Sequence, residues 1–265
     1  MQVITDTQVI PKHICQGRRE PVLFKGYAKR WPAVEKWTWD YLKQLADNRQ
    51  VRLVVGDRES GQAQFTEMAL TRYIDILADP DNCQDKRKLY LKEFDLLTEF
   101  PQLQGDIQCE AYFPENMKVY QDSWIGVKGA ATGLHYDILD NLFTQIRGRK
   151  TFLLLAYDQI SPHDRSDKFD YFARLAKLDL FAENNQAKHV NPIRVEVDAG
   201  DALYIPEGWW HQVKSSDPTI SISGFMETRW QRWIAGTWED IRYFAHNRGW
   251  YKKDHCTCHV TNPDS

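Results

Sequence analysis

The sequence predicts a mainly β fold with flanking helices, and three observations support this class. From Leu89 onward, short β-rich segments alternate with turns that contain Gly, Pro, Asn or Asp, which is typical of a sandwich or barrel. Hydrophobic residues make up 42% of the chain and aromatic residues 13%, which is enough to fill a buried core. The length of 265 residues suits one large β domain with helical additions.

The first part of this domain, residues 1–88, is predicted to mix strands and helices. Short apolar runs bounded by turn residues predict strands at residues 21–26 and 51–55. Apolar side chains at helical intervals predict helices at residues 37–46, capped by Thr38, and at residues 66–77.

The β core is expected over residues 89–228. Its predicted strands lie in LYLKEF, SWIGVKG, LHYDI, NLFTQI, KTFLLLAY, IRVEVDAGDALYIP, HQVKS and TISISGF. A polar stretch at residues 161–191 interrupts these strands, and we expect it to be an insert with a short helix at residues 169–177.

Residues 229–265 are predicted to form a helical extension followed by a tail. Apolar side chains recur there at i, i+3, i+4 and i+7, and Gly249 is placed to end the helix. So wide a stripe, rich in tryptophan, is costly to leave in water. We expect the stripe to pack against the β core, and the alternative is a homodimer interface.

Charge and cysteine content argue against several classes of protein. A formal charge of −3 gives no global field that would attract a polyanion. The five cysteines, an odd number and mostly scattered, do not resemble a disulfide framework and favour a reducing, cytoplasmic setting. The N-terminal residues lack the pattern of a signal peptide, and the longest apolar run, residues 152–157, is too short to span a bilayer.

The C-terminal HCTCH segment, His255 to His259, contains soft metal ligands. A CxC pair without a second spaced pair does not complete a tetrahedral zinc site. We therefore expect a tail without metal, and the alternative is a structural or intermolecular zinc site.

An HxD motif and a distant histidine form the candidate reactive site. His135 and Asp137 are two residues apart, so on a strand both side chains point to the same face. His211, in GWWHQV, begins a later predicted strand. Two imidazoles and one carboxylate form the facial triad that holds non-haem Fe(II) and leaves three positions open. His211 could instead only hydrogen-bond across a strand pair, but a shared cation would satisfy all three polar groups.

The segments IGVKGAATGLHYDILDNLFTQIRGRKTFLL and DAGDALYIPEGWWHQV resemble the JmjC, or cupin-8, class of Fe(II)- and 2-oxoglutarate-dependent oxygenases. This class includes relatives of the asparaginyl hydroxylase that inhibits hypoxia-inducible factor and of the tRNA wybutosine hydroxylase. The resemblance covers roughly residues 20 to 228. It implies a double-stranded β-helix (jelly-roll, cupin-like) core, a catalytic domain at residues 1–228, and His135, Asp137 and His211 as iron ligands.

The resemblance also implies a site for the cosubstrate 2-oxoglutarate. The family's lysine fifteen residues after the first ligand histidine matches Lys150, which would pair with the far carboxylate of 2-oxoglutarate. Thr132 and Tyr90 match hydroxyl donors, and Asn141 matches an asparagine near the metal-bound end. Without the resemblance, Lys150 could belong to a solvated basic turn and Tyr90 could be a core aromatic residue.

The sequence departs from the family at one place. Many relatives have Asn and then Trp in the strand after the last ligand, where this chain has Ser223 and Phe225. The contact with the metal-bound end of 2-oxoglutarate is therefore expected to differ.

The activity implied is hydroxylation of a C–H bond with Fe(II), O₂ and 2-oxoglutarate, with succinate and CO₂ as coproducts. No Ser/His/Asp arrangement, P-loop or GxGxxG motif offers a competing site. We expect the substrate to be a side chain of a protein or peptide. The alternatives are a modified tRNA base, a small molecule, N-methyl demethylation, and a catalytically silent cupin that only binds. The absence of a Lys/Arg tract gives the tRNA alternative little electrostatic support.

Overall fold

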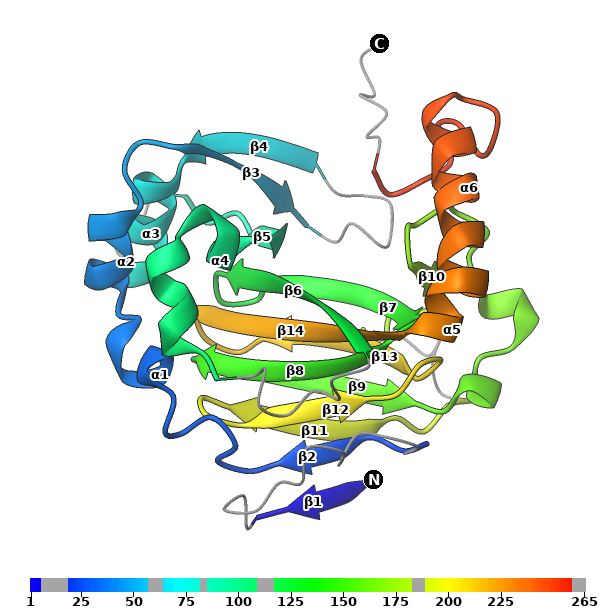
Figure 1. The fold of residues 1–265 in the computed structure, drawn as a ribbon, viewed down its shortest axis with the longest axis horizontal. Coiled ribbons are helices and arrows are strands. Elements are labelled where there is room, and N and C mark those ends of the chain that lie inside the picture. The colour runs from blue at the N-terminus through cyan, green and yellow to red at the C-terminus, as the bar shows by residue number, and fades with distance from the viewer. Residues whose placement is uncertain (6–18, 57–63, 82–84, 109–116, 183–188, 259–265) are drawn as a thin grey trace.

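Two packed β-sheets form the centre of the molecule, and helices cover one side of the larger sheet (Figure 1). The computed structural model describes residues 1–5, 19–56, 64–81, 85–108, 117–182 and 189–258. The larger sheet has the strand order β1-β2-β12-β8-β14-β6-β5-β3-β4, and the smaller one β10-β7-β13-β9-β11. In chain order the strands are β1 (Gln2–Ile4), β2 (Val22–Phe24), β3 (Gln50–Val55), β4 (Gln64–Ala69), β5 (Leu89–Phe94), β6 (Met117–Gly126), β7 (Ala131–Asp137), β8 (Asp140–Arg147), β9 (Arg149–Leu155), β10 (Ala173–Leu175), β11 (Ile193–Asp198), β12 (Ala202–Ile205), β13 (Trp210–Ser215) and β14 (Thr219–Thr228).

The helical elements are short. They are α1 (Pro32–Lys36), α2 (Trp39–Leu45), α3 (Leu70–Ala78), α4 (Leu96–Glu99), the 3-10 helices η1 (Pro101–Asp106), η3 (Tyr157–Gln159) and η4 (Pro162–Asp164), then α5 (Arg229–Gln231), the π-helical η6 (Arg232–Gly236) and α6 (Thr237–Asn247). None of the helices in the described ranges combines the length and the apolar character needed to cross a bilayer.

The core is a double-stranded β-helix, which confirms the predicted fold class. From β6 to β9, and again from β11 to β14, the chain passes between the two sheets, so that four antiparallel strands of one sheet face four of the other. The β8–β9 crossing turns at Gly148, whose φ is +72°. A Cβ atom there would lie 2.3 Å from the Pro218 carbonyl oxygen, so this corner requires glycine.

The N-terminal elements confirm one predicted helix and correct another. Helix α2 begins after Thr38, whose Oγ1 accepts a hydrogen bond from the Tyr41 amide at 3.1 Å. The helix predicted at residues 66–77 begins only at Leu70. The preceding residues form β4, because they pair along the whole length of β3, and this pairing overrides their helical periodicity.

The insert also differs from the prediction, since it has no helix at residues 169–177. Strand β10 pairs antiparallel with β7 instead, placing Leu175 opposite His135 and Ala173 opposite Asp137. Phe172 has a φ of +62°, which is incompatible with a continuous helix. Pairing with the open edge of β7 therefore decides the local structure.

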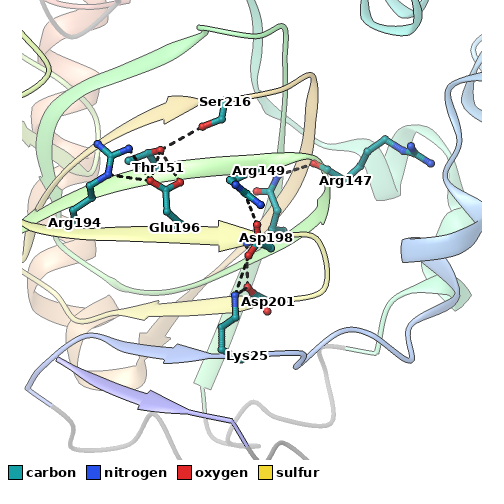
Figure 2. Close-up of polar contacts among 10 residues, drawn as sticks. Lys25, Arg147, Arg149, Thr151, Arg194, Glu196, Asp198, Asp201 and Ser216 are labelled. Carbon is teal, nitrogen blue, oxygen red and sulfur yellow. Dashed lines mark hydrogen bonds and ion pairs between the residues drawn. The ribbon is translucent and has the colours of Figure 1, made fainter.

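The corner between β9 and the β11–β12 turn is held by a group of ion pairs, shown in Figure 2. We call Lys25, Arg149, Asp198 and Asp201 the charged corner. Arg149 Nε lies 2.5 Å from Asp198 Oδ1, and Lys25 Nζ lies 3.1 Å from Asp198 Oδ2 and also contacts Asp201. Although partial burial opposes the change, hydrogen bonds from Lys25 and Arg149 lower the pKa of Asp198.

The C-terminal extension corrects the expectation that its apolar stripe packs against the β core. Helix α6 stands beside the sheets (Figure 1). The stripe faces solvent: Trp233 is 70% exposed and Trp238 61%. The buried side of α6 is polar, since Glu239 is 2% exposed and receives hydrogen bonds from Arg174 and Arg242.

Candidate metal centre and its pocket

The two candidate histidines lie on neighbouring strands of the smaller sheet. His135 on β7 is directly opposite His211 on β13, and their ring centroids are 4.1 Å apart. Asp137 Oδ1 lies 3.8 Å from His135 Nε2, and Asp137 Oδ2 lies 3.6 Å from His211 Nε2. One donor atom from each residue falls within 4.8 Å of the others, so the three side chains could hold one metal ion.

Backbone carbonyls orient both imidazoles toward this point. His135 Nδ1 donates to the Gly133 carbonyl at 2.8 Å, and His211 Nδ1 donates to the Trp209 carbonyl at 3.0 Å. A proton on Nδ1 leaves the lone pair of each Nε2 directed at Asp137, which is the tautomer that a metal requires.

Asp140 fixes the turn that leads into β13. It accepts hydrogen bonds from the Glu207 amide at 2.8 Å and from the Tyr204 hydroxyl at 2.9 Å. Burial raises the pKa of Asp140, and these two hydrogen bonds oppose that rise. The Gly208 amide then donates to the Asp137 carbonyl at 3.1 Å, so this turn is tied to the end of β7.

Lys150 on β9 is the buried cation of the site, with 1% of its surface exposed. Its Nζ donates to the Tyr90 hydroxyl and to Ser221 Oγ, both at 2.8 Å. Among the residues that the structure describes, no carboxylate lies within ion-pair distance of this ammonium. Burial, and repulsion by Lys92, lower the pKa of Lys150 well below its usual range.

A cavity of about 350 Å³ joins the triad to Lys150. All seven residues singled out from the sequence border it: Tyr90, Thr132, His135, Asp137, Asn141, Lys150 and His211. Asn141 is 5% exposed, and its Oδ1 has no hydrogen-bond partner in the described part of the chain. A buried ammonium without an anion and a buried carbonyl oxygen without a donor fit a cavity built for a polar, anionic ligand.

Comparison with known proteins agrees with this geometry. The model of a family described as a cupin-like domain matches residues 11–230. The chain belongs to this JmjC-type cupin-like family.

Relatives of this cupin-like domain include several JmjC proteins. JmjC domain-containing protein A of Dictyostelium discoideum is 30% identical over 223 residues, which are 77% of this chain and 86% of that protein. Jumonji C domain-containing protein 5 of Drosophila melanogaster is 28% identical over 80% of this chain, and the match spans 56% of the longer fly protein. The tRNA wybutosine-synthesizing protein 5 of Gallus gallus is 27% identical over 78% of this chain and 70% of its own length.

The residues that depart from the family pattern border the cavity of this cupin-like domain. Ser223 pairs with Phe143, and Phe225 pairs with Asn141, across β14 and β8. The Phe225 ring packs edge-on against Trp124, with centroids 5.9 Å apart. An apolar ring thus borders the cavity opposite Asn141 on the neighbouring strand.

Several residues that line the pocket or contact its lysine were not identified from the sequence. Ser221 holds Lys150, and a period of two along β14 places it on the same face as Ser223. Lys92 and Glu93 enter the cavity at an irregularity of β5, where Glu93 has a φ of +53°. Asp122 lies near them, and burial, together with Glu93 and Asp95, raises its pKa to about 6.

The rim of the pocket comes from outside the core. Tyr171 and Phe172 of the insert and Arg232 of the C-terminal extension line it. Trp209 and Trp210, which directly precede His211, are absent from this lining. Trp210 is fully buried against Tyr136, with ring centroids 4.7 Å apart, and therefore supports β13.

Proposed function

We propose that this protein is an Fe(II)- and 2-oxoglutarate-dependent oxygenase that hydroxylates a side chain of a protein or peptide, with succinate and CO₂ as coproducts. The observation that carries the proposal is one cavity that is lined both by three convergent metal donors and by the buried Lys150 ammonium. Membership of a JmjC family, whose homologues are typically oxygenases of this class, supports it.

His135, Asp137 and His211 would hold the metal through Nε2, one carboxylate oxygen and Nε2. The bound iron would supply the oxidation of 2-oxoglutarate by O₂ and the delivery of one oxygen atom to a substrate C–H bond. The protein contributes orientation and exclusion of water. The two backbone carbonyls that accept from Nδ1 keep both Nε2 atoms deprotonated and aimed at one point.

Lys150 would bind the far carboxylate of 2-oxoglutarate, and its neighbours would complete the binding site. The ammonium donates two of its three N–H groups to Tyr90 and Ser221, which leaves the third for a ligand. Lys150 is buried, and a charge-assisted hydrogen bond to a carboxylate is strong there. Thr132 borders the same cavity as a hydroxyl donor, and the Asn141 amide would contact the metal-bound end.

The identity of the substrate rests on weaker support than the chemistry. Relatives named arginine-specific and lysine-specific demethylases point to protein side chains, because an N-methyl group presents a C–H bond that the same reaction can hydroxylate. The wybutosine relatives keep a modified tRNA base as the second candidate. A small-molecule substrate and a silent binding domain are the remaining alternatives.

The decisive test is succinate formation from 2-oxoglutarate with Fe(II) and ascorbate in the presence of cell extract. We expect turnover by the unaltered chain and none by Asp137→Ala. Asp75→Ala is a matched control, since Asp75 is an exposed carboxylate on α3 that pairs with Lys43, and it should keep full activity. A folded wild-type protein that forms no succinate with any extract would support the silent binding domain.

Substrate capture separates the remaining candidates. The Asp137→Ala chain, immobilised and incubated with lysate, should enrich peptides that gain the mass of one oxygen on treatment with active enzyme. Loss of a methyl group from those peptides would identify a demethylase. Enrichment of tRNA instead would contradict the proposed substrate class.

We also propose that the exposed stripe of the C-terminal extension joins two copies of this chain. Its large apolar side chains are all exposed: Trp230, Trp233, Ile234, Trp238, Ile241, Phe244 and Trp250. A two-fold contact between identical stripes would remove them from water at once. Light scattering after size-exclusion chromatography should give twice the chain mass, and Trp233→Glu should give a monomer.

A further inference from the structure

A second group of metal-binding side chains lies in the C-terminal extension, apart from the triad. His246 in the last turn of α6 meets Cys256 and Cys258 of the segment that follows, and their donor atoms all lie within 4.8 Å of one another. His246 Nε2 is 3.1 Å from Cys258 Sγ. The sequence shows the CxC pair, but only the fold of residues 247–258 back along α6 adds the histidine.

The histidine of this cluster is oriented as a ligand. His246 Nδ1 donates to the Tyr251 carbonyl at 2.8 Å, so Nε2 carries the lone pair that faces the sulfur atoms. The residue is 2% exposed, and its ring lies 4.4 Å from the Phe169 ring. The arrangement repeats that of the two triad histidines, where a backbone carbonyl also selects the metal-binding nitrogen.

The cysteines are held in place from the other side. The Phe169 amide donates to the His255 carbonyl at 3.0 Å, and the Thr257 amide donates to the Phe169 carbonyl at 3.1 Å. The Thr257 hydroxyl also donates to the buried carboxylate of Asp170. Residues 255–257 are therefore anchored to the insert, with Cys256 inside the anchored segment and Cys258 directly after it.

We propose that His246, Cys256 and Cys258 bind a structural zinc ion, with a fourth group completing the tetrahedron. Thiolate and imidazole are the donors that zinc prefers in structural sites. Both cysteines are reduced in the structure. Binding replaces the two thiol protons by the metal and releases them to solvent.

Such a zinc site would brace the pocket wall. It ties α6 to the backbone of Phe169, and the next residues, Asp170 to Ala173, border the cavity between the triad and Lys150. His255 is not one of the three residues whose donor atoms converge, and its Nε2 lies 2.8 Å from Asp167 Oδ1. This inference does not depend on the proposed oxygenase activity.

The test measures zinc in a chain whose triad is disabled, since that triad could also take up zinc. The Asp137→Ala chain, purified without added metal, should contain about one zinc per molecule by plasma mass spectrometry. Adding Cys258→Ser should reduce the zinc content at least tenfold. Adding His255→Asn instead is the matched control, a histidine in the same segment, and should leave the zinc content unchanged.

A spectrum of the unaltered chain keeps the test decisive should Cys258→Ser fail to fold. Replacement of zinc by Co²⁺ should give an intense thiolate-to-cobalt charge-transfer band in the near ultraviolet, which a triad of nitrogen and oxygen donors does not produce. A folded chain that shows neither zinc nor this band overturns the inference, as does equal zinc content with and without Cys258→Ser.

Discussion

Arg149 and Lys150 are consecutive cations on β9, and they differ in exposure and in the partners of their side chains. Arg149 belongs to the charged corner, where Asp198 lies 2.5 Å away and both side chains are about half exposed. Lys150 is buried, and its described partners are two hydroxyl groups. Two acidic residues show a similar contrast. Hydrogen-bond partners lower the pKa of Asp198 in the charged corner, whereas burial raises the pKa of Asp122 in the pocket.

This contrast distinguishes charged side chains that stabilise the fold from charged side chains that bind a ligand. A cation that only stabilises the chain sits where a carboxylate and water both reach it, as at the charged corner. A cation buried without a counter-ion costs free energy, and the chain recovers that cost only when an anion enters. We therefore expect substitution of Lys150 to reduce activity without reducing stability, and substitution of Arg149 to reduce stability without reducing activity.

The largest effect is expected for Lys150→Met, which removes the buried charge and keeps the length of the side chain. Affinity for 2-oxoglutarate should fall roughly 30- to 4,000-fold, since truncating one partner of a buried charge pair costs about 2–5 kcal/mol. The ligand-free protein should be as stable as before or more stable. Succinate assays and thermal unfolding measure the two effects. A clear loss of stability without ligand would mean that Lys150 serves the fold.

The next effect is stabilisation by the ligand itself. With Mn²⁺ in place of iron, 2-oxoglutarate at about 100 times its Kd should raise the free energy of unfolding by about 2.7 kcal/mol. At the same ligand concentration, Lys150→Met should reduce this gain to less than about 1 kcal/mol, and Arg149→Met should keep it. Pyruvate, which lacks the far carboxylate, is the matched ligand control. Equal protection by pyruvate and 2-oxoglutarate would contradict the role of Lys150.

Asp122→Asn should stabilise the protein by about 1–3 kcal/mol at pH 8. The folded-state pKa of about 6 lies above the ordinary value of 3.8, so the folded carboxyl binds its proton more tightly than the unfolded one. Its ionisation therefore destabilises the fold above pH 6, and the penalty disappears as the pH falls from 6 to 4. Urea unfolding at several pH values checks this. A gain that does not change with pH would exclude titration as its cause.

The smallest effect is expected for Arg149→Met. Exposed ion pairs contribute about 0–1 kcal/mol, and salt screens them. Stability should fall only slightly at low ionic strength and by less still in about 1 M salt, with activity unchanged. If Arg149→Met lost as much activity as Lys150→Met, the distinction between the two positions would be wrong.

The sequence predicted the donors of this site better than their surroundings. His135, Asp137 and Lys150 were identified because strand periodicity and family spacing fix them locally, and the fold places them on one cavity. Ser221 was missed because nothing in TISISGF shows which serine faces a lysine of the other sheet. That contact depends on how the two sheets pack. Asp122 was missed because it lies just before the segment SWIGVKG.

The errors in secondary structure have a common cause. Residues 66–69 and 173–175 have helical periodicity, yet each pairs with the free edge of a neighbouring strand, β3 or β7. Strand pairing links residues far apart in the sequence, so a local pattern cannot reveal it. The exposed stripe on α6 was misjudged for a related reason, since the polar partners of its inner side, such as Arg174, come from the insert.

The direct pairing of His135 with His211 separates the candidate metal donors from the segments that form the rim of the pocket. Reactive donors sit on adjacent strands inside the barrel, whereas Tyr171, Phe172 and Arg232 at the rim belong to an insertion and a terminal appendage. The segments that line the rim could therefore be replaced without altering the paired strands that carry the candidate metal donors. The same separation makes the scaffold suited to loop grafting, with the barrel kept intact.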